Sequence, residues 1–320
     1  MNDVYPLRFQ PIYKPKIWGG RNLERLFDRG LPAGEQIGES WELADLKEGV
    51  SIVLNGPEAG VTLTELTARW GSDLLGAADP MPDGRFPLLL KLLDANGILS
   101  LQVHPDEKAV EEIGEDAALK TECWYYVESR KGYIYKGVRE GVSPDQFRTA
   151  VQEDHAEDVV RRKDVQTGGF DYLPAGTVHA LGPGLVVAEV QTPSDTTYRV
   201  TDWGRGREIH LERSMQCIRF DLTGDRAPGA EGDTLLVTDY FTVAKRTAAA
   251  DEPAQLPQGV CTAVMVLDGF GPMHVGHNSD TEPRVPIRAG DTVLLPATLE
   301  APVFNSESEV SWLEVTLPNK

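Results

Sequence analysis

Cysteine is scarce in this chain. Three residues, Cys123, Cys217 and Cys261, are spread over 320 positions, and no two of them form a C-x-x-C spacing. A small, odd and widely spaced set argues against a disulfide framework and against a cysteine-based zinc site. We therefore expect reduced, buried thiols and a cytoplasmic location.

Long apolar runs and an excess of positive charge are also missing. No stretch approaches the roughly 20 apolar residues that cross a bilayer. The segment Met1–Pro6 lacks the basic and then apolar pattern of a secretion signal. Lys and Arg number 31 against 50 Asp and Glu, a formal net charge of -19, which argues against nucleic acid and anionic membranes as partners. A phosphorylated substrate is not excluded, because a small pocket can be positive on an acidic protein.

The chain does contain many turn residues between short apolar runs. Its 22 Pro and 31 Gly separate segments with the composition of β-strands. The predicted strands include 87–93, 184–191 and 260–267. The predicted helices cover 63–70, 106–119 and a segment from 143 towards 160, where Ser is followed by Pro as in a helix start. We interpret the helices as insertions on a mainly β scaffold.

Two short segments carry residues that bind metals. Residues two apart on a strand point to the same face, so Gln102 and His104 share one face, and Lys120 and Glu122 share another. His179 follows a Pro-Ala-Gly turn. Two imidazoles and a carboxylate are a common ligand set for catalytic zinc and for non-haem iron, and the glutamine adds an amide carbonyl. A lysine beside such a metal suits an anionic or oxyanionic substrate.

A weak internal repeat predicts a duplicated β architecture. The segment Phe170–His179 resembles Gly290–Glu300, since both contain a strand that ends in Pro-Ala and is followed by a turn. Only the first copy carries a histidine after the turn, so we expect the second copy to share the scaffold and to lack the metal. A Pro-, Gly- and acid-rich segment at 224–233 is the predicted boundary. The expected domains are therefore a metal-binding domain at 1–232 and a C-terminal domain at 233–320.

Taken together, these residues and several further motifs resemble the type I phosphomannose isomerases, in particular their short bacterial members. The motifs occur in the same order over nearly the whole chain. They are Ile17-Trp-Gly-Gly20, Ile37-Gly-Glu-Ser-Trp41, Phe86-Pro-Leu-Leu-Leu-Lys91, Gln102-Val-His-Pro-Asp106, Lys120-Thr-Glu-Cys-Trp124, Pro174-Ala-Gly-Thr-Val-His179 and Ser194-Asp-Thr-Thr-Tyr-Arg199.

The resemblance implies a cupin fold, in which jelly-roll β-barrels carry helical insertions and a second, cupin-like barrel lacks the metal. It also implies a zinc-dependent aldose-ketose isomerase that interconverts mannose 6-phosphate and fructose 6-phosphate through a cis-enediol. The expected partner is a small sugar phosphate, bound by a monomer or a small homo-oligomer.

Site residues follow from the same resemblance. The implied ligands of Zn2+, or of another divalent ion, are Gln102, His104, Glu122 and His179. The implied catalytic residues are Arg199, Lys120 and Glu189, and either Lys120, Glu189 or a metal-bound water carries the proton. The implied phosphate-binding residues are Lys91, Ser100 and Arg205, the last of which is lysine in some relatives.

Two other functions fit parts of the pattern. A non-catalytic sugar-phosphate sensor on the same scaffold would tolerate loss of Lys120, Glu189 and Arg199, so their presence argues against it. An iron-dependent cupin oxygenase could use His104, Glu122 and His179, but it needs open positions on the metal for O2. A fourth ligand from Gln102 argues against that chemistry.

Overall fold

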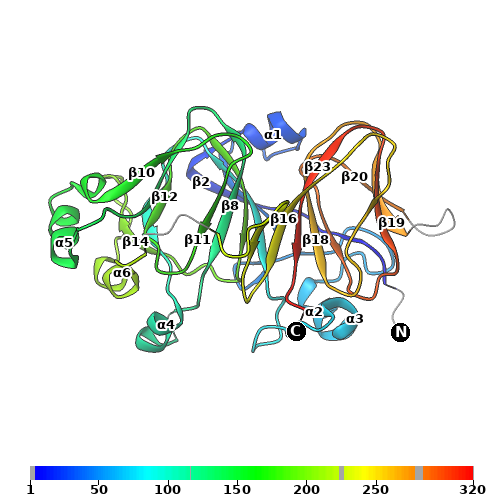
Figure 1. The fold of residues 1–320 in the computed structure, drawn as a ribbon, viewed down its shortest axis with the longest axis horizontal. Helices are drawn as coiled ribbons and strands as arrows, with labels where there is room; N and C mark the ends of the chain where they lie inside the picture. Colours follow the sequence, from blue (N-terminus) through cyan, green and yellow to red (C-terminus); the bar gives the residue numbers. More distant parts are fainter. Residues whose placement is uncertain (1–3, 116, 223–226, 278–283, 320) are drawn as a thin grey trace.

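The computed structural model describes residues 4–115, 117–222, 227–277 and 284–319. Two antiparallel β-sandwiches lie side by side along the long axis of the molecule, and helices α4, α5 and α6 cover the outer part of the first one (Figure 1). The predicted mainly β jelly-roll fold with helical insertions is confirmed. Among the described residues, no helix is long and apolar enough to cross a membrane.

The first sandwich packs a six-stranded sheet, in the order β11-β8-β13-β6-β3-β2, against a five-stranded sheet, in the order β10-β9-β12-β7-β14. Buried side chains from both sheets, such as Trp124 and Leu181, form one apolar cluster between them. The strands are β2 (Ile12–Gly20), β3 (Ile37–Leu43), β6 (Leu89–Ala95), β7 (Leu101–Val103), β8 (Glu122–Ser129), β9 (Tyr133–Val138), β10 (Val160–Asp164), β11 (Phe170–Leu173), β12 (His179–Leu181), β13 (Leu185–Gln191) and β14 (Tyr198–Thr201).

The second sandwich packs a six-stranded sheet, in the order β1-β21-β18-β23-β16-β15, against a four-stranded sheet, in the order β17-β22-β19-β20. Its described interior is filled by apolar side chains that include the stacked pair Phe304 and Trp312. The strands are β1 (Leu7–Arg8), β15 (Thr234–Val237), β16 (Thr242–Ala248), β17 (Ala254–Gln255), β18 (Thr262–Asp268), β19 (Met273–His277), β20 (Arg284–Ile287), β21 (Thr292–Leu295), β22 (Pro302–Ser306) and β23 (Val310–Thr316). A short two-stranded sheet pairs β4 (Asp45–Leu46) with β5 (Gly49–Val50).

The strand orders confirm the predicted duplication. The run β11-β8-β13-β6 of the first sandwich recurs as β21-β18-β23-β16 in the second, and β10-β9-β12-β7 recurs as β20-β19-β22-β17. The two copies of the sequence repeat contain β11 and β21, which occupy matching places. The repeated Pro-Ala turn therefore marks the same corner of the same fold.

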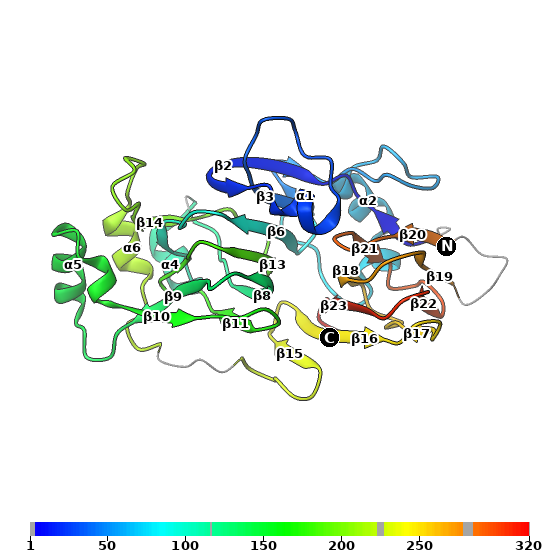
Figure 2. The ribbon, with the colours of Figure 1, turned by 90° about the horizontal axis from the view of Figure 1, so that it is seen from above.

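The domain division at 232/233 stays a prediction, and residues 224–226 of the predicted boundary segment lie outside the described residues. The structure does connect the two parts. Strand β1 pairs with β21, with Leu7 opposite Leu294 and Arg8 opposite Val293. Figure 2 shows this N-terminal segment, in blue, beside the second sandwich.

The predicted helices form, but two of them are shorter than expected. Helix α2 (Leu63–Trp70) matches its prediction. Helix α4 covers only Glu107–Ile113, because Gly114 adopts a positive φ of 85°. Helix α5 (Pro144–Gln152) is capped by the Ser143 side chain as predicted, but it ends before Asp154, whose φ is also positive. The remaining helices are α1 (Asn22–Phe27), α3 (Ser72–Leu75), α6 (Leu211–Cys217) and the short 3-10 turn Ala156–Asp158.

A buried ion pair joins the two sandwiches at their seam. Arg29 donates through Nη1 and Nη2 to the two carboxylate oxygens of Glu42, at 2.7 and 2.9 Å, and its Nη1 also reaches Ser40 Oγ at 2.9 Å. The same guanidinium donates to the carbonyl of Gly290, which precedes β21 in the second sandwich. Because both charges are buried and fully hydrogen-bonded, the pair fixes how β3 meets the second sandwich.

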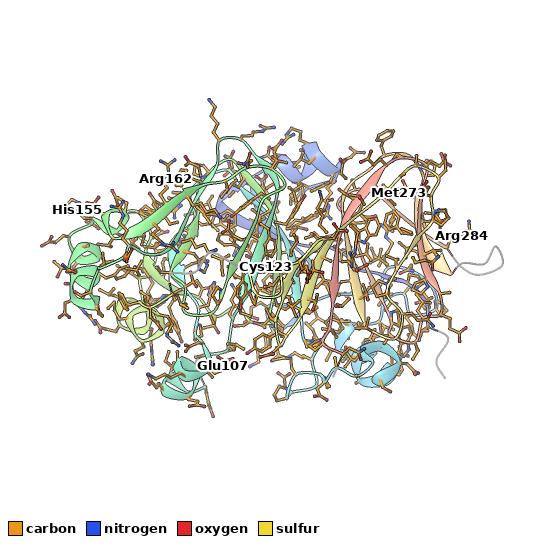
Figure 3. All side chains as sticks on the ribbon, in the orientation of Figure 1. Glu107, Cys123, His155, Arg162, Met273 and Arg284 are labelled. Carbon is orange, nitrogen blue, oxygen red and sulfur yellow. The ribbon has the colours of Figure 1, made fainter. Side chains whose placement is uncertain are left out.

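The cysteine prediction is confirmed, since all three thiols are free and buried. Cys123 lies at the centre of the molecule (Figure 3), in the apolar cluster that both sandwiches share. Burial raises the pKa of its thiol well above the ordinary value, with further contributions from Glu122 and Glu189.

Candidate active site

Three buried side chains meet inside the first sandwich. His104 follows the end of β7, Glu122 begins β8 and His179 begins β12. Glu122 Oε2 lies 3.4 Å from His104 Nε2, and Glu122 Oε1 lies 3.2 Å from His179 Nε2. One ligand atom from each residue lies within 4.8 Å of the others. The strand arrangement therefore brings together the carboxylate and the two imidazoles that the sequence pattern suggested.

Both imidazoles are held by backbone carbonyls on their far side. His104 Nδ1 lies 2.9 Å from Thr196 O, and His179 Nδ1 lies 2.8 Å from Thr177 O. A carbonyl only accepts, so each Nδ1 carries a proton, and an imidazole with its single proton on Nδ1 has its lone pair on Nε2. Anchoring of this kind is usual for metal-binding histidines. It directs both lone pairs towards Glu122.

The residues present fit a divalent metal ion. His104 Nε2 and both carboxylate oxygens of Glu122 are buried and have no hydrogen-bond partner among the described residues. Such orphaned acceptors are costly unless something positive sits between them. Burial, assisted by Lys120, holds the pKa of His104 well below its usual value, so the ring is neutral. Burial alone would raise the pKa of Glu122, but the positive charge of Lys120 opposes it, and the pKa lies well below its usual value.

Gln102 lies beside this triad. Its Nε2 is 3.4 Å from His179 Nε2, and its Oε1 accepts a hydrogen bond from Ser100 Oγ at 3.3 Å. A metal ligand from glutamine is the carbonyl oxygen, so ligation would require the amide group to turn over. The position of Gln102 beside the triad suits the predicted role.

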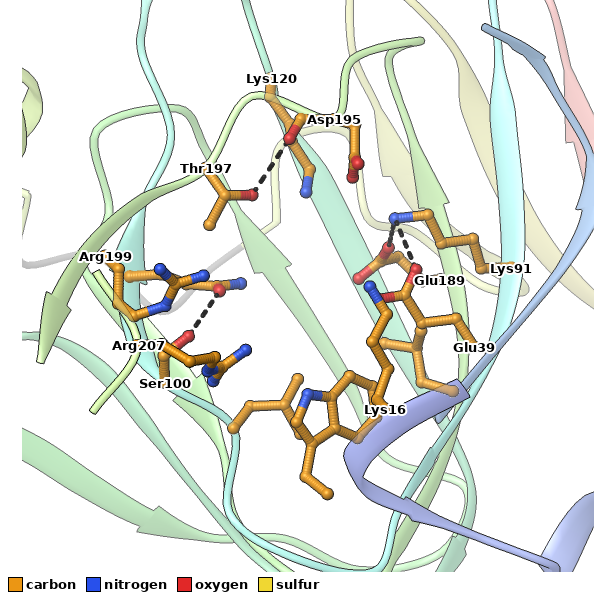
Figure 4. Close-up of a pocket in the computed structure, with 14 residues that line it drawn as sticks. Lys16, Glu39, Lys91, Ser100, Lys120, Glu189, Asp195, Thr197, Arg199 and Arg207 are labelled. Atoms are coloured by element: carbon orange, nitrogen blue, oxygen red, sulfur yellow. Dashed lines mark hydrogen bonds and ion pairs between the residues drawn. The ribbon is translucent and has the colours of Figure 1, made fainter. Parts of the chain in front are cut away.

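A cavity of about 260 Å³ opens beside the triad (Figure 4). Gln102, Ser100, Lys120 and Glu189 line it together with the apolar side chains of Trp18, Leu93 and Leu99. Its charged residues comprise more bases than acids. The bases are Lys16, Lys91, Lys120, Arg199 and Arg207, and the acids are Glu39, Glu189 and Asp195. On a chain of net charge -19, this local excess of positive charge favours an anionic ligand.

Lys120 connects the cavity to the triad. Its ammonium lies 3.2 Å from Glu122 Oε2, and its side chain is 4% exposed. Lys120 lies just before β8 and not within it. Its side chain nevertheless points to the same side as that of Glu122, as the period of two predicted.

Acidic and basic side chains alternate along the cavity wall, in the order Glu189, Lys91, Glu39 and Lys16. Lys91 Nζ lies 3.0 Å from Glu189 Oε1 and 3.9 Å from Glu39 Oε2. Burial would lower the pKa of Lys91, but Glu189 and Glu39 raise it above the usual value, so Lys91 is a permanent cation. Burial, with the charge of Glu122, raises the pKa of Glu189 despite Lys91 and Lys120. For Glu39, Lys91 and Lys16 outweigh burial and bring the pKa to about 2.

Arg199 lines the cavity as predicted, whereas Arg205 does not. Burial and the nearby Arg207 lower the pKa of Arg199. Arg205 instead donates from Nη1 to Ile98 O and from Nη2 to Asp202 Oδ1, each at 2.6 Å. Arg207, which the sequence analysis did not single out, extends into the cavity beside Ser100 and Arg199 (Figure 4).

Lys16 and Glu39 are also cavity residues that the sequence analysis missed. They form an ion pair with Lys16 Nζ 2.8 Å from Glu39 Oε1. Glu39 belongs to the motif Ile37–Trp41, which could have marked it as a site residue. Lys16 immediately precedes the motif Ile17–Gly20. Their approach to Lys91 depends on β3 lying next to β6, which no local pattern reveals.

Comparison with known proteins finds relatives that match nearly the whole chain. The family model of the phosphomannose isomerase type I catalytic domain matches residues 7–134. The chain is 35% identical to the mannose-6-phosphate isomerase of Streptococcus mutans, over 95% of this chain and 96% of that protein. It is 34% identical to the mannose-6-phosphate isomerase ManA of Bacillus subtilis, over 91% of this chain and 93% of that protein. The crystal structure of a mannose 6-phosphate isomerase from Bacillus subtilis superposes with a TM-score of 0.84 at 30% identity, covering 97% of this chain and 99% of that one.

Proposed function

The chain belongs to the type I phosphomannose isomerase family, and from this premise we propose that it interconverts mannose 6-phosphate and fructose 6-phosphate with the help of a bound Zn2+ ion. One observation carries the proposal. The buried cluster of His104, Glu122 and His179, in which His104 Nε2 and both Glu122 oxygens lack a hydrogen-bond partner among the described residues, borders a cavity with an excess of bases, so a metal site and an anion site adjoin. The three free thiols also support a reducing, cytoplasmic setting.

His104, Glu122 and His179, with Gln102 as the fourth ligand, would hold the ion. When bound, a divalent ion supplies Lewis acidity that polarises the oxygens on C1 and C2 of the sugar. Since only one of the four ligands is charged, the site would keep about one net positive charge.

The chain's own residues would then move the protons. Isomerisation removes the C2 proton of the open-chain aldose and returns a proton to C1 through a cis-enediol, while a proton passes between the two oxygens. Lys120 and Glu189 both line the cavity and are the two candidates for this transfer. The pKa of Glu189 is raised, which brings it closer to the pH at which the enzyme works. A carboxylate with such a pKa is a more effective general acid or base. Arg199 would stabilise negative charge on the oxygens without losing its own proton.

The remaining bases would bind the phosphate. Arg207 lies with Ser100 on one side of the cavity in Figure 4, and Lys91 lies on the other. Charge-assisted hydrogen bonds from such groups position the far end of the substrate, and this binding energy can orient the reacting carbons.

The direct test is an isomerisation assay with mannose 6-phosphate, coupled to a dehydrogenase, before and after chelator treatment. We expect activity that the chelator removes and zinc restores. A folded, zinc-loaded protein that binds the sugar phosphate without turning it over would instead be a sensor. Restoration by iron alone, with oxygen consumption, would contradict the zinc-isomerase assignment.

The contributions of Arg207 and Arg205 to substrate binding can be compared through the KM of their Ala variants. Replacing Arg207 by Ala should raise KM for mannose 6-phosphate roughly 10- to 100-fold, because a hydrogen bond to a charged group contributes about 1.5–3 kcal/mol. Both guanidinium groups bind Asp202, but Arg205 also donates to Ile98 O and does not line the cavity, so the Arg205→Ala variant should raise KM less. Steady-state kinetics of both variants decide the matter. A larger KM effect at Arg205 would return the phosphate role to the residue that the resemblance indicated.

A further inference from the structure

Trp124 contacts two residues of the proposed site at once. Its indole Nε1–H donates to Glu189 Oε2 at 2.8 Å. Its ring meets the imidazole of His179 edge to face, with centroids 5.3 Å apart and planes at 81°. The side chain is 1% exposed. A buried indole N–H normally needs a partner, and here that partner is a carboxylate of the cavity.

The strand register explains why this residue cannot move aside. On β8, Trp124 lies opposite Glu189 of β13 on one side and opposite Asp171 of β11 on the other. Asp171 is itself buried, and it accepts hydrogen bonds from Tyr126 Oη and Lys136 Nζ, each at 2.9 Å. In the register of the sheet, Trp124 therefore lies between Glu189, which its indole N–H binds, and the buried Asp171.

We propose that Trp124 is a positioning residue for the isomerase site. Its N–H holds one oxygen of Glu189, which leaves the other oxygen, Oε1, towards Lys91. Its ring supports His179 from the side, while the carbonyl of Thr177 anchors Nδ1 of the same imidazole. The inference rests on the proposed function, in which Glu189 exchanges protons and His179 binds the metal.

The N–H and the ring can be tested separately. Trp124→Phe keeps an aromatic ring and removes the donor. We expect kcat to fall about tenfold, because a hydrogen bond to a charged group is lost, with KM and zinc affinity each within about twofold of wild type. Trp312→Phe is the matched control. Trp312 is 2% exposed in the second sandwich, and its Nε1 has no hydrogen-bond partner among the described residues, so that variant should keep wild-type kcat.

A double-mutant cycle then asks whether the donor acts through Glu189. In a Glu189→Gln background, Trp124→Phe should lower kcat by less than about twofold, since the carboxylate that it orients is already gone. Equal losses in both backgrounds, or wild-type kcat in Trp124→Phe alone, would show that Trp124 only packs.

The ring is tested without any activity measurement. Trp124→Ala should weaken zinc binding about tenfold in competition with a chromophoric chelator, which is the lower end of the effect of removing an outer support from a metal ligand. If that variant does not fold, Trp124→Leu makes a smaller change in volume. Unchanged zinc affinity in the folded variant would overturn the support of His179. If wild-type protein shows no isomerisation while the ring variants still lose zinc affinity, the proposed function fails and the contact with His179 stands.

Discussion

Replacing His179 by Ala is expected to release the metal and to lower turnover by at least roughly 10³-fold, because a bound metal contributes several kcal/mol of transition-state stabilisation. The Nε2 atom of His179 lies 3.2 Å from Glu122 Oε1, and no other described histidine or acid is grouped with His104 and Glu122. Removing it would leave three of the four proposed ligands and a single imidazole, that of His104. His104→Ala should behave in the same way.

The measurement is metal content after gel filtration, followed by the coupled assay with and without added zinc. His155→Ala is the matched control, since His155 is exposed at the outer end of the first sandwich (Figure 3). A His179→Ala protein with full metal content and full turnover would show that the ion binds elsewhere.

Replacing Lys120 by Met should leave the metal in place and lower kcat by about 10²–10⁴-fold, the usual cost of removing a general acid or base. The ammonium lies 3.2 Å from Glu122 Oε2. Taking this positive charge away reduces repulsion towards a bound cation, so zinc affinity should stay the same or increase. Metal content and kcat measured on the same preparation separate these two effects.

Two results would contradict this role for Lys120. A Met variant that loses zinc would make Lys120 a structural support of the metal site. A variant with wild-type kcat would leave Glu189 as the remaining side-chain candidate for proton transfer.

Local patterns anticipated only part of the cluster of His104, Glu122 and His179. The period of two placed Lys120 beside Glu122, and Gln102 lies against His179 of the same cluster, even though His104 and Lys120 fall just outside β7 and β8. No spacing rule joins His179 to them, because their approach depends on β12 pairing with β7. The resemblance to a family supplied that link before the sheet order was known.

The cavity wall was less predictable. Arg205 and Arg207 lie two residues apart in one loop, and the backbone between β14 and α6 decides which of them faces the cavity. Gly204 and Gly206 both adopt positive φ angles there, as does Trp203 at 55°. A turn of this kind reverses direction within a few residues, so counting along the chain from Arg199 does not identify the side chain that reaches the substrate.

The pairing of β1 with β21 has a consequence for how the protein is made. During translation, Leu7 and Arg8 leave the ribosome long before Leu294 and Val293, so β1 has no strand partner while most of the chain is still being synthesised. The larger sheet of the second sandwich therefore gains its last edge only after that sandwich has emerged. A chain trimmed at its amino end would expose the backbone of β21 and lose the ion pair of Arg8 with Asp291. Such an open sheet edge can pair with strands of other chains and cause aggregation. Affinity tags or fusion partners placed before β1 should therefore leave β1 able to pair with β21.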